Sequence, residues 1–183
     1  MESNAVALPA RAVPRHLTYA VTVAVAVFFT FAIHEGAHWL AGELLGNDMK
    51  MTLNSAYPSS GAYLEPWHWN WISAAGPLIT LLQAIAVFLL MRTRSAAALY
   101  PFLLTPAVMR VMAMCMNVIK PQDEGRISQS LGIGTFTLPL VVCAALAYLT
   151  ILASRRAGYS TRFNVASIVL IVAFSSVLIL ASQ

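Results

Sequence analysis

The sequence predicts an all-α polytopic membrane protein that crosses the bilayer about five times. Of its 183 residues, 59% are hydrophobic and 10% are charged, and the mean hydropathy is +0.73. A soluble domain carries roughly 25% charged residues, so this chain has too few to cover a water-facing surface. The composition therefore excludes a soluble enzyme, a disordered tail and a nucleic-acid-binding protein, and it implies the lipid bilayer as a partner.

Long segments without any charged residue predict the individual helices. Four such segments, 16–34, 66–91, 127–154 and 163–183, are 19, 26, 28 and 21 residues long, and a fifth, 95–119, contains only Arg110. A helix needs ~20 residues to span a bilayer, and a backbone in lipid must satisfy its own hydrogen bonds. We expect one membrane-embedded domain over 1–183, with a tail over 1–15 and helices over about 17–45, 71–91, 96–119, 128–153 and 163–181.

The segment between the first two helices has a different pattern. The first helix is expected to stop at Gly46-Asn47, a typical C-terminal signal. Over 49–65 apolar and polar residues alternate at first, and Pro58 to Gly61 has turn composition. This predicts a short hairpin or irregular loop at the membrane surface. The tryptophans of 67–71 then mark the interface at which the second helix enters the bilayer.

The distribution of basic residues predicts the orientation. With five spans, the tail and the second and fourth loops fall on one side and hold seven arginines, whereas the other side holds three basic residues. By the positive-inside rule the N-terminus is cytoplasmic. The seven arginines are Arg11, Arg15, Arg92, Arg94, Arg155, Arg156 and Arg162, and the three opposing residues are Lys50, Lys120 and Arg126.

His34, Glu35 and His38 form an HExxH motif inside the first predicted helix. Residues four apart lie on one helical face, so the two histidines can bind one metal ion, while Glu35 can take a proton from a metal-bound water. An ionisable residue in a membrane helix costs ~2.5–3.5 kcal/mol, so this cluster needs a compensating partner such as a dication. Zinc suits these ligands. The alternative is a polar cluster that packs against another helix or lines an ion path.

A hydrolytic zinc site usually has a third protein ligand. Asp123 and Glu124 follow the third predicted helix and fall on the same side as 46–66, toward which the HExxH motif is displaced. Zinc, one aspartate and one glutamate sum to zero charge if both histidines are neutral. Either acid could be the ligand. Arg110 lies at a depth similar to that of His34, so it is a candidate to stabilise an oxyanion or a carboxylate of the site.

Three segments with further motifs stand in order along the chain: HEGAHWLAGELLGNDMKM from His34, SAAGPLIT from Ser73, and NVIKPQDEGRI from Asn117. The first resembles the metal-binding helix of the site-2 protease family of intramembrane zinc metalloproteases. The second is similar to the family's Ala-Gly-Pro signature, and the third to its Asn…Pro…Asp-Gly segment. Together they cover roughly half of the chain. No loop is long enough for a PDZ domain, so the resemblance is to the compact bacterial type.

The resemblance implies a complete site. His34, His38 and Asp123 would be the ligands of one Zn²⁺ per chain, and Glu35 the base that activates water. Asn117 would help to hold the substrate or the transition state. The Ala-Gly-Pro segment would start a helix that packs beside the metal-binding helix. The implied location is the bacterial cytoplasmic membrane.

The predicted function is that of a zinc-dependent endopeptidase in regulated intramembrane proteolysis. It would hydrolyse a peptide bond in or near a transmembrane segment of a membrane protein substrate, with Glu35 taking and returning the proton. The strand-like segment 49–57 could pair with the unwound substrate by edge addition. Two alternatives are a catalytically inactive relative that binds membrane proteins, and a transporter of metal ions or protons.

Overall fold

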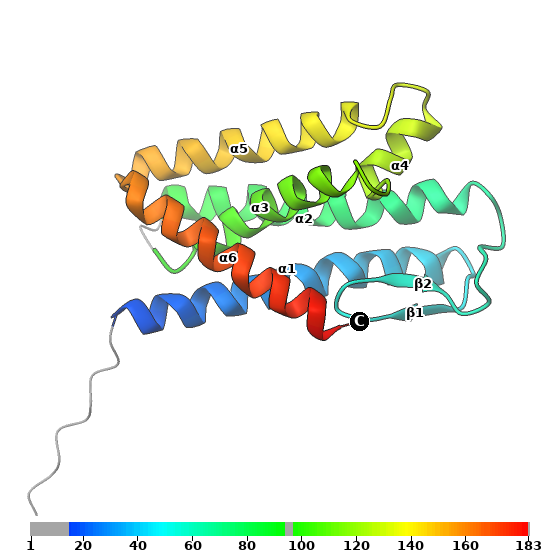
Figure 1. Ribbon diagram of the computed structural model, residues 1–183, viewed down its shortest axis with the longest axis horizontal. Helices are drawn as coiled ribbons and strands as arrows, with labels where there is room; N and C mark the ends of the chain where they lie inside the picture. The colour runs from blue at the N-terminus through cyan, green and yellow to red at the C-terminus, as the bar shows by residue number, and fades with distance from the viewer. Residues whose placement is uncertain (1–14, 94–96, 183) are drawn as a thin grey trace, which may run out of the picture.

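The structure is a computed structural model that describes residues 15–93 and 97–182. Over these residues the chain forms six helices and one two-stranded hairpin (Figure 1). The predicted tail before Arg15, with Arg11, lies outside the described residues, as does Arg94. In chain order the elements are α1 (Arg15–Leu44), β1 (Met49–Met51), β2 (Ala56–Pro58), α2 (His68–Thr93), α3 (Tyr100–Met116), α4 (Asp123–Ser130), α5 (Thr137–Ala157) and α6 (Thr161–Ala181).

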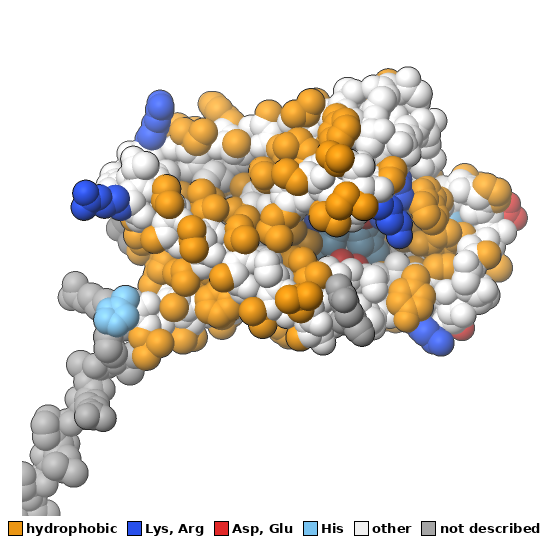
Figure 2. Space-filling view, in the orientation of Figure 1, with side chains coloured by type: hydrophobic (Ala, Val, Ile, Leu, Met, Phe, Trp, Pro, Cys, Tyr) orange, Lys and Arg blue, Asp and Glu red, His pale blue; other side chains and the backbone are white. Residues whose placement is uncertain are grey.

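The helices are those of an integral membrane protein. Four of them, α1, α2, α5 and α6, are long and apolar enough to cross a bilayer, and α3 is a shorter apolar helix. Their outward side chains are large and hydrophobic, as at Val21, Leu82 and Leu140. Figure 2 shows hydrophobic side chains spread over the visible face of the bundle. The predicted all-α polytopic membrane fold is confirmed.

The central element of the bundle is α3, which contributes side chains to two hydrophobic clusters. One cluster joins it to α1 and α6, and the other joins it to α2 and α5. A helix covered by protein on several sides is apolar all round. The first cluster includes Val23, Val27, Leu104, Val108 and Ile171, and the second includes Ala84, Leu103, Ala107 and Leu146.

The hairpin predicted after the first helix is confirmed. β1 and β2 pair antiparallel, with Lys50 opposite Tyr57, and they lie beside the C-terminal end of α1 (Figure 1). The strands are joined by residues 52–55, where the N–H of Thr52 donates to the carbonyl of Ser55 at 2.8 Å. The turn predicted at Pro58 to Gly61 also forms, with Gly61 at φ +80°, but it follows β2 instead of connecting the strands.

The fourth predicted helix, 128–153, is wrong at its start. α4 ends at Ser130 and α5 begins only at Thr137. Between them Gly132 and Gly134 have φ of +69° and +86°, a left-handed conformation that favours glycine and ends a helix. The apolar run continues across this break, so hydropathy alone joined two helices. The other ends shift slightly: α2 begins at 68 instead of 71, and α3 ends at 116 instead of 119.

The five apolar helices α1, α2, α3, α5 and α6 alternate in direction along the chain, so the bundle has two distinct ends (Figure 1). Arg92, at the end of α2, lies at the same end as Arg155 and Arg156 in the last turn of α5. The hairpin, α4 and the C-terminal end of α6 lie at the other end, which is here called the hairpin end.

Candidate metal centre

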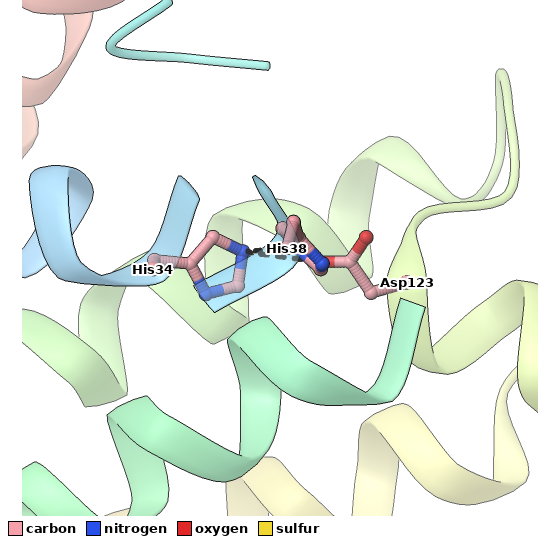
Figure 3. A group of neighbouring side chains, drawn as sticks. All are labelled: His34, His38 and Asp123. Carbon is pink, nitrogen blue, oxygen red and sulfur yellow. Dashed lines mark hydrogen bonds and ion pairs between the residues drawn. The ribbon is translucent and has the colours of Figure 1, made fainter. Parts of the chain in front are cut away.

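Two histidines of α1 and one aspartate of α4 meet at the hairpin end (Figure 3). The Nε2 atoms of His34 and His38 are 3.1 Å apart. The Oδ2 atom of Asp123 lies 3.1 Å from the first and 3.4 Å from the second. All three side chains are buried. The spacing of four residues places both imidazoles on one face of α1, and α4 delivers the carboxylate from a distant part of the chain.

The donor set fits one zinc ion in chemistry and in spacing. Tetrahedral zinc with bonds of 2.0–2.1 Å would hold its ligand atoms about 3.3 Å apart, close to the separations seen here. The Nδ1 atom of His38 donates to the carbonyl oxygen of Ile72, so a neutral His38 presents the lone pair of Nε2 to the group. Two imidazole nitrogens and one carboxylate oxygen thus converge without any competing apolar group between them.

Gly76 of α2 makes room for both imidazoles. A Cβ atom built at this position would lie 2.3 Å from Cε1 of His34 and 2.3 Å from Nε2 of His38. Contacts that short do not occur, so any larger residue must displace the histidines. The Ala-Gly-Pro segment therefore lets the backbone of α2 lie close to the side chains of His34 and His38. Its expected position beside the HExxH helix is the one observed, but it lies inside α2, which begins at His68, and does not start a helix.

The structure separates the two acids that the sequence left as alternatives. Asp123 faces the histidines, whereas Glu124 faces Arg110 of α3, whose Nη1 lies 3.1 Å and 3.2 Å from the two carboxylate oxygens. Asp123 is thus the third member of the group.

Two arginines complete the charged surroundings. Arg110 also approaches Asp123 Oδ2, at 3.3 Å, and Arg126 pairs with Asp123 Oδ1. With neutral histidines, the three acids, counting Glu35, and the two arginines sum to −1, and a dication brings the total to +1. The neutral total expected from the sequence omitted the arginines and counted one glutamate instead of two. The positive partners of the acids come from the protein as well as from any bound ion.

A cavity of about 430 Å³ opens onto this group. Glu35, 7% exposed, lines it together with the three candidate ligands. The opposite wall includes hairpin residues 54–56 and Ile179 of α6. Figure 2 shows histidine and acidic side chains at the bottom of a hollow in the hydrophobic surface. The HExxH motif is therefore accessible from outside the bundle, although its histidines are buried.

Arg110 and Asn117, the two residues predicted to act on substrate or transition state, have different positions. Arg110 lines the cavity, as its predicted depth implied. Asn117 does not: its Oδ1 accepts the N–H of Gln122 at 2.7 Å, and a Cβ at Gly125 would lie 2.0 Å from that oxygen. These contacts join the end of α3 to α4, the helix that carries Asp123. A role of Asn117 toward substrate stays a prediction.

Sequence reasoning missed the role of Arg126. It stands three residues after Asp123 on α4 and pairs with it, and its guanidinium lies 5.0 Å from the ring centroid of Trp69. The signal was present, because residues three apart on a helix are neighbours. The region around Asp123 was expected to be a loop, however, so this spacing carried no weight.

Comparisons with family models, with curated proteins and with solved structures find no match to this chain. The resemblance to the site-2 protease family therefore depends on the three sequence segments alone.

Proposed function

We propose that this protein is an intramembrane zinc metalloendopeptidase that cleaves a peptide bond in or near a transmembrane segment of another membrane protein. The observation that carries the proposal is the group of His34, His38 and Asp123, whose ligand atoms lie within 4.8 Å of one another at a cavity that Glu35 also lines. Three ligands with an adjacent carboxylate are what metal-assisted hydrolysis requires. The first and third of the family-like sequence segments supply these same residues.

Each residue has a defined task in this proposal. When bound, zinc supplies a water with a pKa of ~7 and polarises the carbonyl of the scissile bond. Glu35 accepts the proton of the attacking water and returns it to the leaving amine. Gly76 leaves the histidines the space they occupy, and Arg126 holds one oxygen of Asp123.

The hairpin is suited to bind an extended peptide. Its internal hydrogen bonds pass through residues 48 and 59 and residues 52 and 55. In an antiparallel pair the hydrogen-bonded positions alternate, so the N–H and carbonyl of Ala56 point away from β1. Ala56 also lines the cavity. A substrate segment that has lost its helical hydrogen bonds could therefore pair with the outer edge of β2, beside the metal ligands.

The orientation is part of the proposal. Arg92, Arg155 and Arg156 lie at the end opposite the hairpin. The positive-inside rule then puts that end and the N-terminus in the cytoplasm of a bacterial cell, with the cavity nearer the exterior. Labelling of a cysteine introduced at Lys120 by an impermeant reagent in intact cells tests this assignment, in a background with Cys115 and Cys143 replaced.

Proteolysis is tested by comparing the intact protein with its Glu35→Gln variant. New N-termini within membrane proteins are measured in cells that produce each form, and zinc is measured in the purified proteins. We expect fragments only with the intact protein, and about one zinc per chain in both, because Glu35 is not a ligand. Glu65→Gln, on the exposed loop before α2, is the matched control and should cleave normally.

The same experiment separates the alternatives. Equal fragments from the Glu35→Gln variant would sink the protease assignment. Zinc without any fragments in either form would favour an inactive relative. Zinc or proton flux into liposomes that contain the purified protein, without proteolysis, would favour a transporter.

A further inference from the structure

Arg110 is a buried cation placed directly beside the proposed metal ligands. Its side chain is 3% exposed, with Nη1 3.3 Å from Asp123 Oδ2 and Nη2 3.4 Å from His34 Nε2. A guanidinium keeps its charge under all ordinary conditions. From this position it repels a second cation and competes for the oxygen of Asp123 that faces the histidines. A metal centre here requires that the charge of Arg110 be balanced by another group.

Glu124 supplies that balance. Both of its carboxylate oxygens lie within 3.2 Å of Arg110 Nη1, and its side chain is 6% exposed. Asp123 and Glu124 are consecutive in the first turn of α4, so their side chains leave the helix about 100° apart. One acid therefore reaches the histidines while its neighbour reaches Arg110.

Asp123 is also held from the side away from the histidines. Arg126 pairs with Oδ1, and the guanidinium of Arg126 lies over the ring of Trp69. This leaves Oδ2 as the oxygen that faces both imidazoles. The carboxylate is thus oriented by two arginines, but only Arg110 contacts the oxygen that a metal would need.

We propose that Arg110 and Glu124 form a matched ion pair that keeps Asp123 Oδ2 available to the metal. Glu124 shares Arg110 Nη1 with Asp123 Oδ2 and so weakens the hold of Arg110 on that oxygen, and Arg110 restrains Glu124 from becoming an additional ligand. Both are positioning residues. This inference rests on the metal site of the proposed function, but not on its protease activity. It also gives a physical reason for the second acid that stands between Asp123 and Gly125.

The test measures metal binding by the full chain purified in detergent. Glu124→Gln keeps the side-chain size but removes the carboxylate that competes with Asp123 for Arg110, so Arg110 should bind Asp123 more tightly. Zinc affinity, measured by competition with a chelating dye, should therefore fall about 10–100-fold, as it does when other residues that orient metal ligands are changed. Arg110→Gln frees the Glu124 carboxylate, so the visible spectrum of the Co²⁺-loaded variant should weaken as an extra oxygen ligand joins. The double variant should regain the parent affinity to within about threefold, because the changes compensate.

A merely structural ion pair would behave differently. Its loss would lower the unfolding temperature of both single variants, but the folded variants would still bind zinc with the affinity of the parent and give its Co²⁺ spectrum. That result would overturn the inference. If a glutamine variant does not fold, Arg110→Lys and Glu124→Asp take its place, and parental affinity and spectrum in both would likewise overturn it. A parent protein that binds no zinc would refute the metal centre of the proposed function itself.

Discussion

The two ends of the helix bundle are held together by different chemistry. At the end opposite the hairpin, neutral groups pair: the Tyr100 hydroxyl donates to Asn164 Oδ1 at 2.9 Å, and the Asn164 amide donates to Ser154 Oγ at 2.8 Å. This end is here called the neutral end after these hydrogen bonds, although Arg92, Arg155 and Arg156 also lie there. The hairpin end also contains a cluster of ionisable side chains, those of His34, His38, Arg110, Asp123, Glu124 and Arg126.

The two ends also differ in how completely their polar atoms are paired. At the neutral end, Tyr100 and Asn164 use their side-chain groups on each other and on Ser154. At the hairpin end, His34 Nδ1, Arg110 Nε and Arg126 Nε are buried without a hydrogen-bond partner. Because lipid offers no water to satisfy such groups, a membrane protein keeps them mainly where function needs them. One end is held by neutral hydrogen bonds, and the other carries the group of side chains that we propose binds a metal ion.

The strongest test of this difference between the two ends is to remove the carboxylate of Asp123, which contacts both histidines and both arginines. Asp123→Ala should abolish stoichiometric zinc binding, because a catalytic zinc site needs three protein ligands. Metal analysis of the purified protein measures this directly. Ser154→Ala, which removes a hydroxyl at the neutral end, should retain about one zinc per chain. Zinc retained at full affinity by Asp123→Ala would contradict the assignment of the third ligand.

A methyl group added at Gly76 should have the next largest effect. Gly76→Ala forces both imidazoles to move, so we expect at least a 10-fold loss of zinc affinity, and overpacking should cost about 1–3 kcal/mol of stability. The matched control is Gly36→Ala, within the HExxH motif itself, where an added Cβ meets nothing within 4 Å. It should bind zinc normally, with unfolding temperature unchanged or raised, since alanine favours a helix. Equal zinc affinity in the two variants would count against the role of Gly76.

The hairpin edge can be tested without touching the metal ligands. Ala56→Pro removes the N–H that points away from β1, so one backbone hydrogen bond to substrate is lost, worth about 0.5–1.5 kcal/mol. Cleavage should fall a few-fold to about 10-fold while zinc content stays the same. Ala56→Val keeps the N–H and serves as control. Equal loss in both variants would indicate that side-chain size matters here, and not strand pairing.

The smallest expected effect is at the neutral end. Tyr100→Phe removes the hydroxyl that donates to Asn164. Side-chain hydrogen bonds within membranes average about 0.6 kcal/mol, so thermal unfolding in detergent should shift slightly. Zinc affinity and cleavage should match those of the parent. A loss of zinc in this variant would mean that the two ends are coupled, which contradicts the division of roles.

Local patterns in the sequence predicted local features of the structure. The spacing of His34 and His38 fixed their common face of α1, and the alternation after residue 49 predicted the hairpin. The break between α4 and α5 was missed because apolar composition was weighed above Gly132 and Gly134. Backbone conformation at those glycines, and not hydropathy, ends the helix.

Long-range contacts were harder to predict. The choice between Asp123 and Glu124 depends on where Arg110 of α3 lies relative to α4, and no periodicity within either segment specifies that. The space that Gly76 leaves for the two imidazoles depends in the same way on how closely α2 approaches α1. Family resemblance pointed to Asp123 and Gly76, but their physical roles follow only from the packing of helices distant in sequence.

The short length of α3 has a consequence for where a substrate is cut. Its 17 residues make a rod of ~26 Å, less than the ~30 Å thickness of the hydrocarbon layer. The chain turns toward α4 after this short rod, and α4 delivers Asp123 to a histidine, His38, that lies about 9 Å inside the end of α1. A protease built this way would cut its target toward one end of a transmembrane segment, and not at its middle.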